Sequence, residues 1–156
     1  MKVIITGISG FVGKNLSNYL SEKSFNVDGV SLRNTTWKEG LNGRAIIHLA
    51  GKAHDTKKTS HTSEYFKINR DLTKDLFDAF LQSDVKDFIY FSSVKAVADE
   101  VSNALNEEVI GNPKTPYGIS KLHAEEYILS KSFLNKRVFI IRPCMIHGTR
   151  NKGNLN

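Results

Sequence analysis

Short runs of apolar, β-branched residues alternate along this chain with longer segments in which apolar residues recur every three or four positions. The short runs predict β-strands, and the longer segments predict helices with one buried face. Strands that alternate with helices indicate a parallel sheet, because successive parallel strands need long crossover connections. The predicted strands are 3–5, 27–32, 45–50, 87–91 and 138–141, and the predicted helices are 12–20, 63–82 and 116–130.

This order of elements predicts an α/β protein with a doubly wound parallel sheet and helices on both faces, which is a Rossmann-like fold. The segment 45–50 is almost continuously hydrophobic, as expected for a strand that is buried on both faces. The stretch 34–43 is rich in Asn, Thr and Gly and leaves room for one further short strand.

The composition fits one globular domain. The chain has 156 residues, of which 40% are hydrophobic and 24% are charged, a balance typical of folded rather than disordered chains. The single cysteine, Cys144, excludes an internal disulfide framework, and no group of Cys and His residues has the spacing of a structural metal site. We therefore expect no bound metal and a reducing, cytoplasmic setting.

The net charge of +6 would favour an anionic partner. Nucleic acid, an anionic membrane surface and a small phosphorylated ligand all meet that description. No nucleic-acid recognition motif accompanies the charge, and no apolar run reaches the roughly 18 residues of a membrane span. We therefore expect neither a nucleic-acid partner nor a membrane partner.

Three glycines, spaced three residues apart, lie between the first predicted strand and the first predicted helix in the sequence TGISGFVG. At this point a doubly wound sheet presents backbone N–H groups and a helix N-terminus to an anion. We expect Gly7 to permit a tight turn, Gly10 a close approach of a pyrophosphate, and Gly13 close packing of helix on strand. A glycine-rich turn that serves packing alone is the alternative. The loop residues expected at the dinucleotide are Gly7, Ser9, Gly10, Phe11, Val12 and Gly13.

The end of the second predicted strand bears on which dinucleotide would bind. This place usually carries an acidic residue that hydrogen-bonds the adenosine ribose and disfavours a 2′-phosphate. Here it falls to Ser31, with Arg33 two residues later. A neutral side chain beside a cation removes the repulsion and offers a partner to a phosphate, so NADP would be accommodated at least as well as NAD. An arginine in a solvated loop is the alternative interpretation.

Candidate chemistry lies in the sequence TPYGISK. If Pro116 begins a helix, Tyr117 and Lys121 are four residues apart and share one face. A tyrosine with an ordinary pKa of about 10 is a poor base at neutral pH, but a nearby ammonium favours the phenolate. Lys121 is therefore expected to lower the pKa of Tyr117.

Two serines follow the strand 87–91, at the edge where parallel sheets bind ligands. A hydroxyl group there could hydrogen-bond the same reacting oxygen as Tyr117. We favour Ser93 for this role, with Ser92 as the alternative.

Together these segments resemble one family, the extended short-chain dehydrogenases/reductases, and within it the NAD(P)-dependent nucleotide-sugar epimerases and dehydratases. The similarity covers nearly the whole chain, with the motifs in the family's order. The motifs are TGISGFVG, HLAGKAH after the central strand, FKIN, FSSVKAV, YGISK and IIRPCMIHG.

The resemblance implies catalytic and cofactor-binding residues. Tyr117 would be the catalytic acid/base, Lys121 would bind the nicotinamide ribose, and Ser93 would polarise the C–O group of the substrate. His48 would lie near the cofactor through its backbone, or it would be a hydrogen-bonded histidine of the core. Asn69 would support the active-site helix or its water network. The other cofactor contacts implied are Leu49, Ala50, Gly51, Asn69 and Pro143.

The activity implied is that of a nucleotide-sugar epimerase or dehydratase, which transfers hydride with NAD or NADP through a keto-sugar intermediate. A net NADP-dependent reductase or dehydrogenase of the same superfamily and a non-catalytic dinucleotide-binding module are the alternatives. The expected partners are a nucleotide-sugar and a second copy of the chain in a homodimer.

The resemblance also implies a division of the chain. Residues 1–147 would form the NAD(P)-binding domain, and residues 148–156 would begin a substrate-binding domain that is otherwise absent from this sequence. Without that domain, cofactor binding could persist while turnover is lost. A basic stretch after the central strand is interpreted as a solvated loop near the cofactor, and it consists of Lys52, His54, Lys57, Lys58 and His61.

Overall fold

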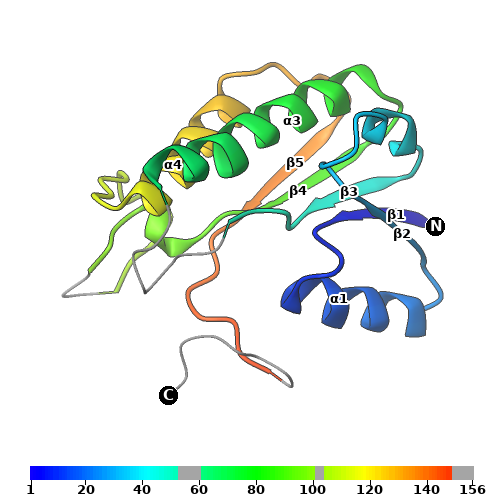
Figure 1. Cartoon of the computed structure of the whole chain (residues 1–156), viewed down its shortest axis with the longest axis horizontal. Coiled ribbons are helices and arrows are strands. Elements are labelled where there is room, and N and C mark those ends of the chain that lie inside the picture. The colour runs from blue at the N-terminus through cyan, green and yellow to red at the C-terminus, as the bar shows by residue number, and fades with distance from the viewer. Residues whose placement is uncertain (53–60, 101–103, 149–156) are drawn as a thin grey trace.

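Five parallel strands form one sheet in the order β2-β1-β3-β4-β5 (Figure 1). The computed structural model describes residues 1–52, 61–100 and 104–148 of the chain. Each pair of neighbouring strands is parallel, as the alternation of strands and helices predicts. The strands are β1 (Lys2–Thr6), β2 (Asn26–Val30), β3 (Ala45–His48), β4 (Asp87–Phe91) and β5 (Arg137–Ile141).

Helices lie on both faces of the sheet, which confirms the predicted fold class. Helix α1 (Phe11–Glu22) lies on one face, while α3 (Leu72–Gln82) and α4 (Pro116–Leu129) lie side by side on the other (Figure 1). None of the helices in the described ranges is long and apolar enough to cross a membrane. The shorter elements are η1 (Trp37–Gly40), α2 (Thr62–Tyr65), η2 (Phe66–Asp71) and η3 (Val94–Ala96).

The core lies between the sheet and the layer formed by α3 and α4. Phe77 and Phe80 of α3 are fully buried against Phe88 of β4, with each ring centre 5.1 Å from that of Phe88. These side chains repeat at the helical spacing that predicted the buried face of α3. Replacing one of the rings by alanine would cost about 3–5 kcal/mol of stability.

The stretch 34–43 contains the 3₁₀ helix η1 and not the further short strand that its composition allowed. Trp37, the first residue of η1, packs against the edge of the hydrophobic core. A single anchored aromatic residue, in a stretch without alternating apolar positions, explains why this segment forms a short turn of helix and does not extend along the sheet.

The predicted helix 63–82 is interrupted. Its first turn is α2, followed by η2, which is a π-helical turn, and then by α3. A π-helical turn accommodates one extra residue and occurs frequently at functional sites. Here the wider turn places Asn69 inside the molecule with no exposed area.

Strand β1 pairs with β2 on one side and with β3 on the other, so the strand order reverses at β1. In open parallel sheets, ligands bind outside the carboxyl ends of the strands at such a reversal. The loops that follow β1, β3, β4 and β5 are therefore where a binding site is expected.

Candidate active site

Two of the three glycines after β1 are required by the packing of the chain itself. Gly7 has a φ of +72°, and a Cβ atom there would lie 2.7 Å from the Ala50 nitrogen. A Cβ on Gly13 would lie 2.6 Å from the Ile8 Cα. Gly10 differs, because its Cβ would meet only the Gly7 carbonyl oxygen, at 3.2 Å. Internal packing therefore explains Gly7 and Gly13, and it leaves the space in front of Gly10 open to a ligand.

The N-terminus of α1, beside Gly10, is suited to an anion. Gly10 is the N-cap residue, no side chain caps the helix, and the first turn carries no acidic residue. Within its own cap and first turn, the helix therefore offers no anion to the positive end of its dipole or to its first N–H groups. A diphosphate fits this arrangement. In this loop Ser9 is exposed, whereas Phe11 and Val12 are half-buried.

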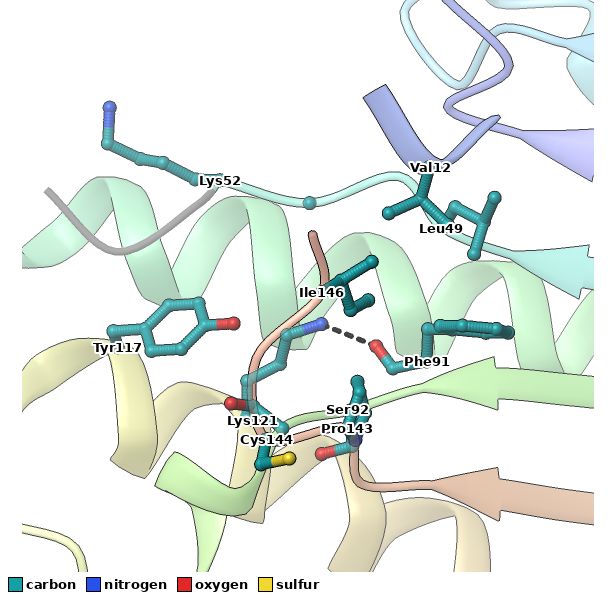
Figure 2. A pocket seen from close by; sticks show the side chains of 12 residues that line it. Val12, Leu49, Lys52, Phe91, Ser92, Tyr117, Lys121, Pro143, Cys144 and Ile146 are labelled. Atoms are coloured by element: carbon teal, nitrogen blue, oxygen red, sulfur yellow. Dashed lines mark hydrogen bonds between the residues drawn. The ribbon is translucent and has the colours of Figure 1, made fainter. Parts of the chain in front are cut away.

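A cavity of about 280 Å³ lies at the carboxyl ends of the strands, next to this loop. Figure 2 shows Tyr117 and Lys121 reaching it from α4, with Val12 and Leu49 on the opposite side. The structure thus brings together residues from the first helix, the central strand and the last helix. The predicted residues that line the cavity are Val12, Leu49, Gly51, Ser93, Tyr117, Lys121 and Pro143.

Ser93 and Ser92 have different partners. Hydrogen bonding with Ser93 lowers the pKa of Tyr117, although burial outweighs this effect and raises that pKa above its ordinary value. The Ser92 hydroxyl instead donates to the carboxylate of Glu125. Of the two serines, Ser93 is therefore the one whose side chain acts on the Tyr117 phenol.

The Lys121 side chain is buried beneath the cavity, with 6% of the residue exposed. Its Nζ donates a hydrogen bond to the Phe91 carbonyl oxygen at 2.9 Å (Figure 2) and lies 4.8 Å from the centre of the Tyr90 ring. Burial lowers the pKa of Lys121 to about 8, and the negative charge of Glu125 acts in the opposite direction.

The sequence predicts that Lys121 lowers the pKa of Tyr117, and the structure does not show this effect. The pKa of Tyr117 is raised by burial, and Ser93, not Lys121, is the group that lowers it. The physical reason is the direction of the ammonium group, which donates to the backbone of β4. Without a ligand in the cavity, Tyr117 therefore stays protonated at neutral pH.

The residues around the start of α4 fix the position of Tyr117. Thr115 is the N-cap residue, and its Oγ1 accepts a hydrogen bond from the Gly118 N–H at 3.2 Å and donates to the Asp99 carboxylate at 2.7 Å. Gly118 allows α4 to approach η3, because a Cβ there would overlap the Lys95 carbonyl oxygen. This close approach places the first turn of α4 beside the end of β4.

His48 is a core residue held by a directed chain of hydrogen bonds. The Thr73 Oγ1 donates to the Asn69 carbonyl at 2.7 Å, so it accepts from His48 Nε2–H at 2.9 Å. His48 Nδ1 then accepts from the Thr6 Oγ1 at 2.6 Å, which in turn accepts from the Ala50 N–H at 3.2 Å. Complete burial lowers the pKa of His48 to about 3 and keeps the ring neutral. Of the two roles expected for His48, the structure shows the core histidine.

Asn69 does not line the cavity, but it holds the loop that does. Its amide group accepts from the Lys52 N–H at 2.7 Å and donates to the Lys52 carbonyl and to the Ser120 Oγ, both at 3.1 Å. Ser120 in turn donates to the Tyr117 carbonyl at 2.7 Å. Asn69 therefore connects the loop after β3 to the first turn of α4.

Ser31 and Arg33 lie apart from the cavity. Both follow the end of β2, the edge strand of the sheet, and both are exposed. Neither lines the cavity around Tyr117. They could meet only a ligand that extends from the cavity past Gly10 toward the edge of the sheet, as a dinucleotide would.

The basic stretch after β3 is described only at its two ends. Lys52 lines the cavity and forms an ion pair with Glu64 at 2.9 Å. His61 is the N-cap residue of α2. The other three residues of the stretch, His54, Lys57 and Lys58, lie outside the described residues, as does most of the segment 148–156. Among the described residues, no group of three or more His, Cys, Asp or Glu side chains could hold a metal ion.

Several residues of the site were not predicted from the sequence. Glu125, on α4, is buried beneath the cavity and binds Arg142, the residue that follows β5. Its position four residues after Lys121 was a usable signal, since the two residues must share one helical face. The other unpredicted lining residues are Phe91 and Ile146, whereas Lys52 and Cys144, which also line the cavity, come from segments expected near it.

Comparison with known proteins relates this site to a family. The sequence model of the NAD dependent epimerase/dehydratase family matches residues 39–156, which include Ser93, Tyr117 and Lys121. The chain belongs to this family. The glycine loop lies before the matched segment.

Relatives within the family have several activities. The chain is 29% identical to the UDP-glucose 4-epimerase of Vibrio cholerae, over 97% of this chain and 54% of that protein. It is also 29% identical to the GDP-6-deoxy-D-mannose reductase of Pseudomonas aeruginosa, over 91% of this chain and 51% of that protein. The chain thus spans about half the length of the curated relatives it matches.

Solved structures share the fold. MoeE5 in complex with UDP-glucuronic acid and NAD has a TM-score of 0.82 and 25% identity, covering 91% of this chain and 54% of that one. RMD from Pseudomonas aeruginosa, complexed with NADPH, has a TM-score of 0.76 and 29% identity, covering 92% and 53% respectively. Members of the family therefore bind either NAD or NADPH.

Proposed function

We propose that this chain provides the cofactor-binding half and the proton-transfer residues of an NAD(P)-dependent enzyme that epimerises or dehydrates a nucleotide-sugar. Residues 1–147 form the cofactor domain in this proposal, and residues 148–156 begin the part that holds the sugar. The observation that carries the proposal is the convergence of Tyr117, Ser93 and Lys121 on a single cavity beside the open glycine loop.

Tyr117 and Ser93 act on the oxygen of the sugar carbinol. The Tyr117 hydroxyl exchanges a proton with that oxygen, and the Ser93 hydroxyl hydrogen-bonds the same atom and keeps it in place. The raised pKa of Tyr117 holds its proton when the cavity is empty. A cationic group brought close to the phenol would favour the phenolate and so prepare Tyr117 to accept a proton.

The cofactor, when bound, supplies the hydride acceptor and donor. Gly10 and the N-terminus of α1 would hold its diphosphate, Lys121 would hydrogen-bond its ribose, and Leu49, Ala50, Gly51 and Pro143 would line its path. Asn69 supports this path through the Lys52 backbone. The cofactor and the Tyr117 hydroxyl must lie in the same cavity, because the hydride is exchanged at the carbinol carbon of the sugar and the proton at the adjacent oxygen.

Cofactor binding is the first test. Purified chain is titrated with NAD and with NADP by calorimetry, together with Gly10→Val and with Asn18→Val, a matched exposed position on α1. We expect binding by the wild-type chain and by Asn18→Val, and a loss of at least about tenfold in Gly10→Val, because the side chain fills the space in front of the helix N-terminus. Wild-type chain that binds neither dinucleotide would overturn the proposal, and full binding by Gly10→Val would overturn the role of the loop.

Proton transfer is the second test. The chain with bound cofactor is fused to the sugar-holding half of a relative, because this sequence spans only about half of such proteins. The fusion is incubated with UDP- and GDP-sugars, and hydride transfer is followed by nicotinamide absorbance. We expect Tyr117→Phe to abolish the transfer and to leave cofactor affinity within about twofold, because only the hydroxyl is removed. Equal transfer by Tyr117→Phe would exclude Tyr117 as the acid/base.

A net reductase that uses NADPH is the second candidate function. It is favoured by Ser31 and Arg33, which follow the end of β2 without an acidic side chain at that place. It is also favoured by the similarity to RMD, whose structure contains NADPH, and to the GDP-6-deoxy-D-mannose reductase. Preferential binding of NADP that is lost in Arg33→Glu would support this function, whereas preference for NAD would support the epimerase. In either case we propose a nucleotide-sugar as substrate, the cytoplasm as location and a homodimer as assembly.

A further inference from the structure

An ion pair between a buried carboxylate and a partly exposed arginine lies behind the residues that line the cavity. The Glu125 side chain, from α4, is 1% exposed and accepts hydrogen bonds from Arg142 Nη2 at 2.6 Å and from Arg142 Nε at 3.1 Å. The Ser92 hydroxyl donates to the same carboxylate. One carboxylate therefore joins α4 to the residue after β4 and to the residue after β5.

Glu125 also carries the negative charge that acts on Lys121, where it opposes the lowering of the Lys121 pKa by burial. The two residues are one helical turn apart and both buried, so they lie on the same face of α4. Among the described residues, burial keeps three other titratable groups of this region neutral, because it lowers the pKa of His48 to about 3 and raises the pKa of the Tyr90 and Tyr117 phenols. Lys52 is a further cation that lines the cavity. Arg142 adds a second positive charge on the far side of Glu125.

Stability alone does not explain this arrangement. Removing two charged groups from water costs several kcal/mol per ion, and apolar residues of similar size are often as stabilising as a buried pair. A buried carboxylate at a site with a buried ammonium has another use, because it opposes the tendency of the ammonium to lose its proton. The bidentate geometry of Arg142 further fixes where the carboxylate lies.

We propose that Glu125 is a positioning residue of the candidate site, whose carboxylate holds α4 against the ends of β4 and β5 and keeps the Lys121 ammonium charged and in place. Arg142 orients that carboxylate from the loop that forms the wall of the cavity. The proposal rests on the proposed function only for the use that the site makes of Lys121.

The test follows the titration of Lys121 by NMR in protein labelled with carbon-13 lysine, without cofactor or substrate. The Lys121 signal is assigned by its loss in Lys121→Met. In the wild-type chain we expect a pKa of about 8. In Glu125→Gln it should fall by roughly one pH unit, because the stabilising charge is removed. In Glu126→Gln, an exposed neighbour on the same helix with the same change of charge, it should stay within about 0.2 of the wild-type value.

Arg142→Gln is a second variant, and it should shift the pKa of Lys121 in the opposite direction. Removing this cation leaves the field of Glu125 uncompensated, so the pKa of Lys121 should rise. Opposite shifts in the two variants are not expected from a general loss of structure. An unchanged pKa in folded Glu125→Gln would overturn the proposal, and so would an unchanged or lowered pKa in Arg142→Gln, which decides the question if Glu125→Gln does not fold.

The outcome is independent of the proposed function. If Lys121 titrates as expected but neither dinucleotide binds, the proposed function fails while the role of Glu125 stands. If the dinucleotide binds and the titration is unchanged by either substitution, the proposed function stands and the role of Glu125 fails.

Discussion

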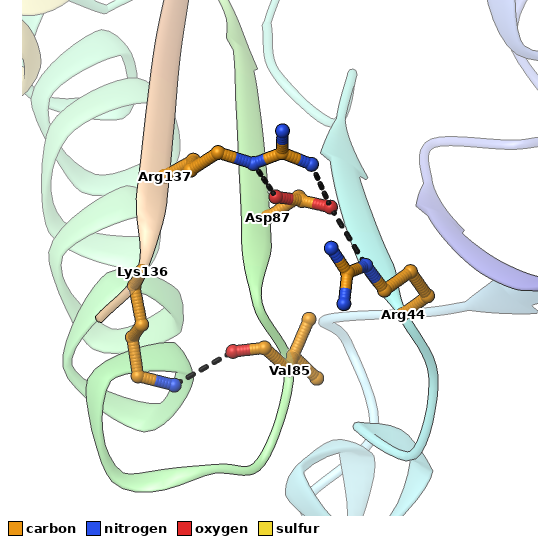
Figure 3. A network of polar contacts seen from close by, with 5 residues as sticks. All are labelled: Arg44, Val85, Asp87, Lys136 and Arg137. Carbon is orange, nitrogen blue, oxygen red and sulfur yellow. Dashed lines mark hydrogen bonds and ion pairs between the residues drawn. The ribbon is translucent and has the colours of Figure 1, made fainter.

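Ion pairs between a carboxylate and arginine lie at both ends of the sheet, but they differ in their exposure to solvent. At the amino edge, Asp87 of β4 accepts hydrogen bonds from Arg137 Nε at 2.6 Å and from Arg44 Nε at 3.1 Å (Figure 3). The two arginine side chains are 63% and 47% exposed. At the carboxyl edge, Glu125 is held by Arg142, whose side chain is only 27% exposed.

Solvent access accounts for the difference between these ion pairs. Water screens the charges at the amino edge. There the pairs connect Asp87 and Arg137, the first residues of β4 and β5, to Arg44, which precedes β3, and they add modestly to stability. At the carboxyl edge, burial shifts the pKa values of His48 and Lys121 far from their ordinary values. Polar groups that are costly to bury are concentrated where ligands of such sheets bind, which is typical of a functional site.

The largest expected effect is on the free energy of unfolding, when a glycine at the carboxyl edge of the sheet is replaced by alanine. In Gly13→Ala, at the carboxyl edge, the Cβ would lie 2.6 Å from the backbone of Ile8, and backbone cannot move aside. We expect a loss of at least about 2 kcal/mol in the free energy of unfolding, measured by urea denaturation. Gly43→Ala, near the amino edge, is the control, because its Cβ would come no closer than 3.2 Å to the Ile4 side chain and the Lys2 carbonyl oxygen, so a shift of a few tenths of an ångström would relieve the contact. An equal loss in both variants would remove this contrast.

The next effect is a dependence of stability on pH at the carboxyl edge. The folded-state pKa of His48 is about 3, below the ordinary value of 6.5, so the unfolded chain binds the proton more readily. Stability therefore falls as the pH drops below 6.5, by about 2 kcal/mol between about pH 6.5 and pH 5. Urea denaturation should show this fall in the wild-type chain and a smaller one in His48→Gln.

His147→Gln serves as the control for that measurement, since His147 is exposed. It should retain the pH dependence of the wild-type chain. If His48→Gln also retained it, a group other than His48 would be responsible for the acid sensitivity.

The smallest effect is expected from Asp87→Asn. Hydrogen bonds from Arg137 lower the pKa of Asp87, so its contribution is present at neutral pH and is lost as the pH falls through that value. Because both arginines are exposed, we expect a decrease in Tm of only about 2–4 °C at neutral pH and low salt. Thermal denaturation in high salt should reduce the difference between variant and wild type, and a difference that persists would show that the pair is not screened.

Much of the fold could be predicted, because periodicity records which face of an element is buried. The segments that became α1, α3 and β5 show it clearly. The π-helical turn could not be predicted, since 66–71 has the same apolar spacing as the helix around it. The helical turn η1 was missed for a different reason, which is that Trp37 depends on a core formed by distant strands.

For the candidate site, sequence reasoning identified most of the residues that line the cavity, but it missed Glu125 and Arg142, which lie behind them. Tyr117 and Lys121 were predicted from helical spacing, and both line the cavity. The direction of the Lys121 ammonium was not predicted, because it depends on a backbone carbonyl of β4. Arg142 was missed because its partner is 17 residues away in the chain, and only the register of β5 brings the two together.

The hydrogen-bond chain that begins at Ala50 has a consequence for slow motions. Its N–H group donates to a hydroxyl that is itself committed to His48, so this amide can exchange with solvent only when the ends of β1 and β3 separate. Hydrogen exchange at Ala50 would therefore report the rate and free energy of that opening, although the residue lies in a loop. The exchange rate of this amide would therefore measure how often the ends of β1 and β3 separate next to the cavity.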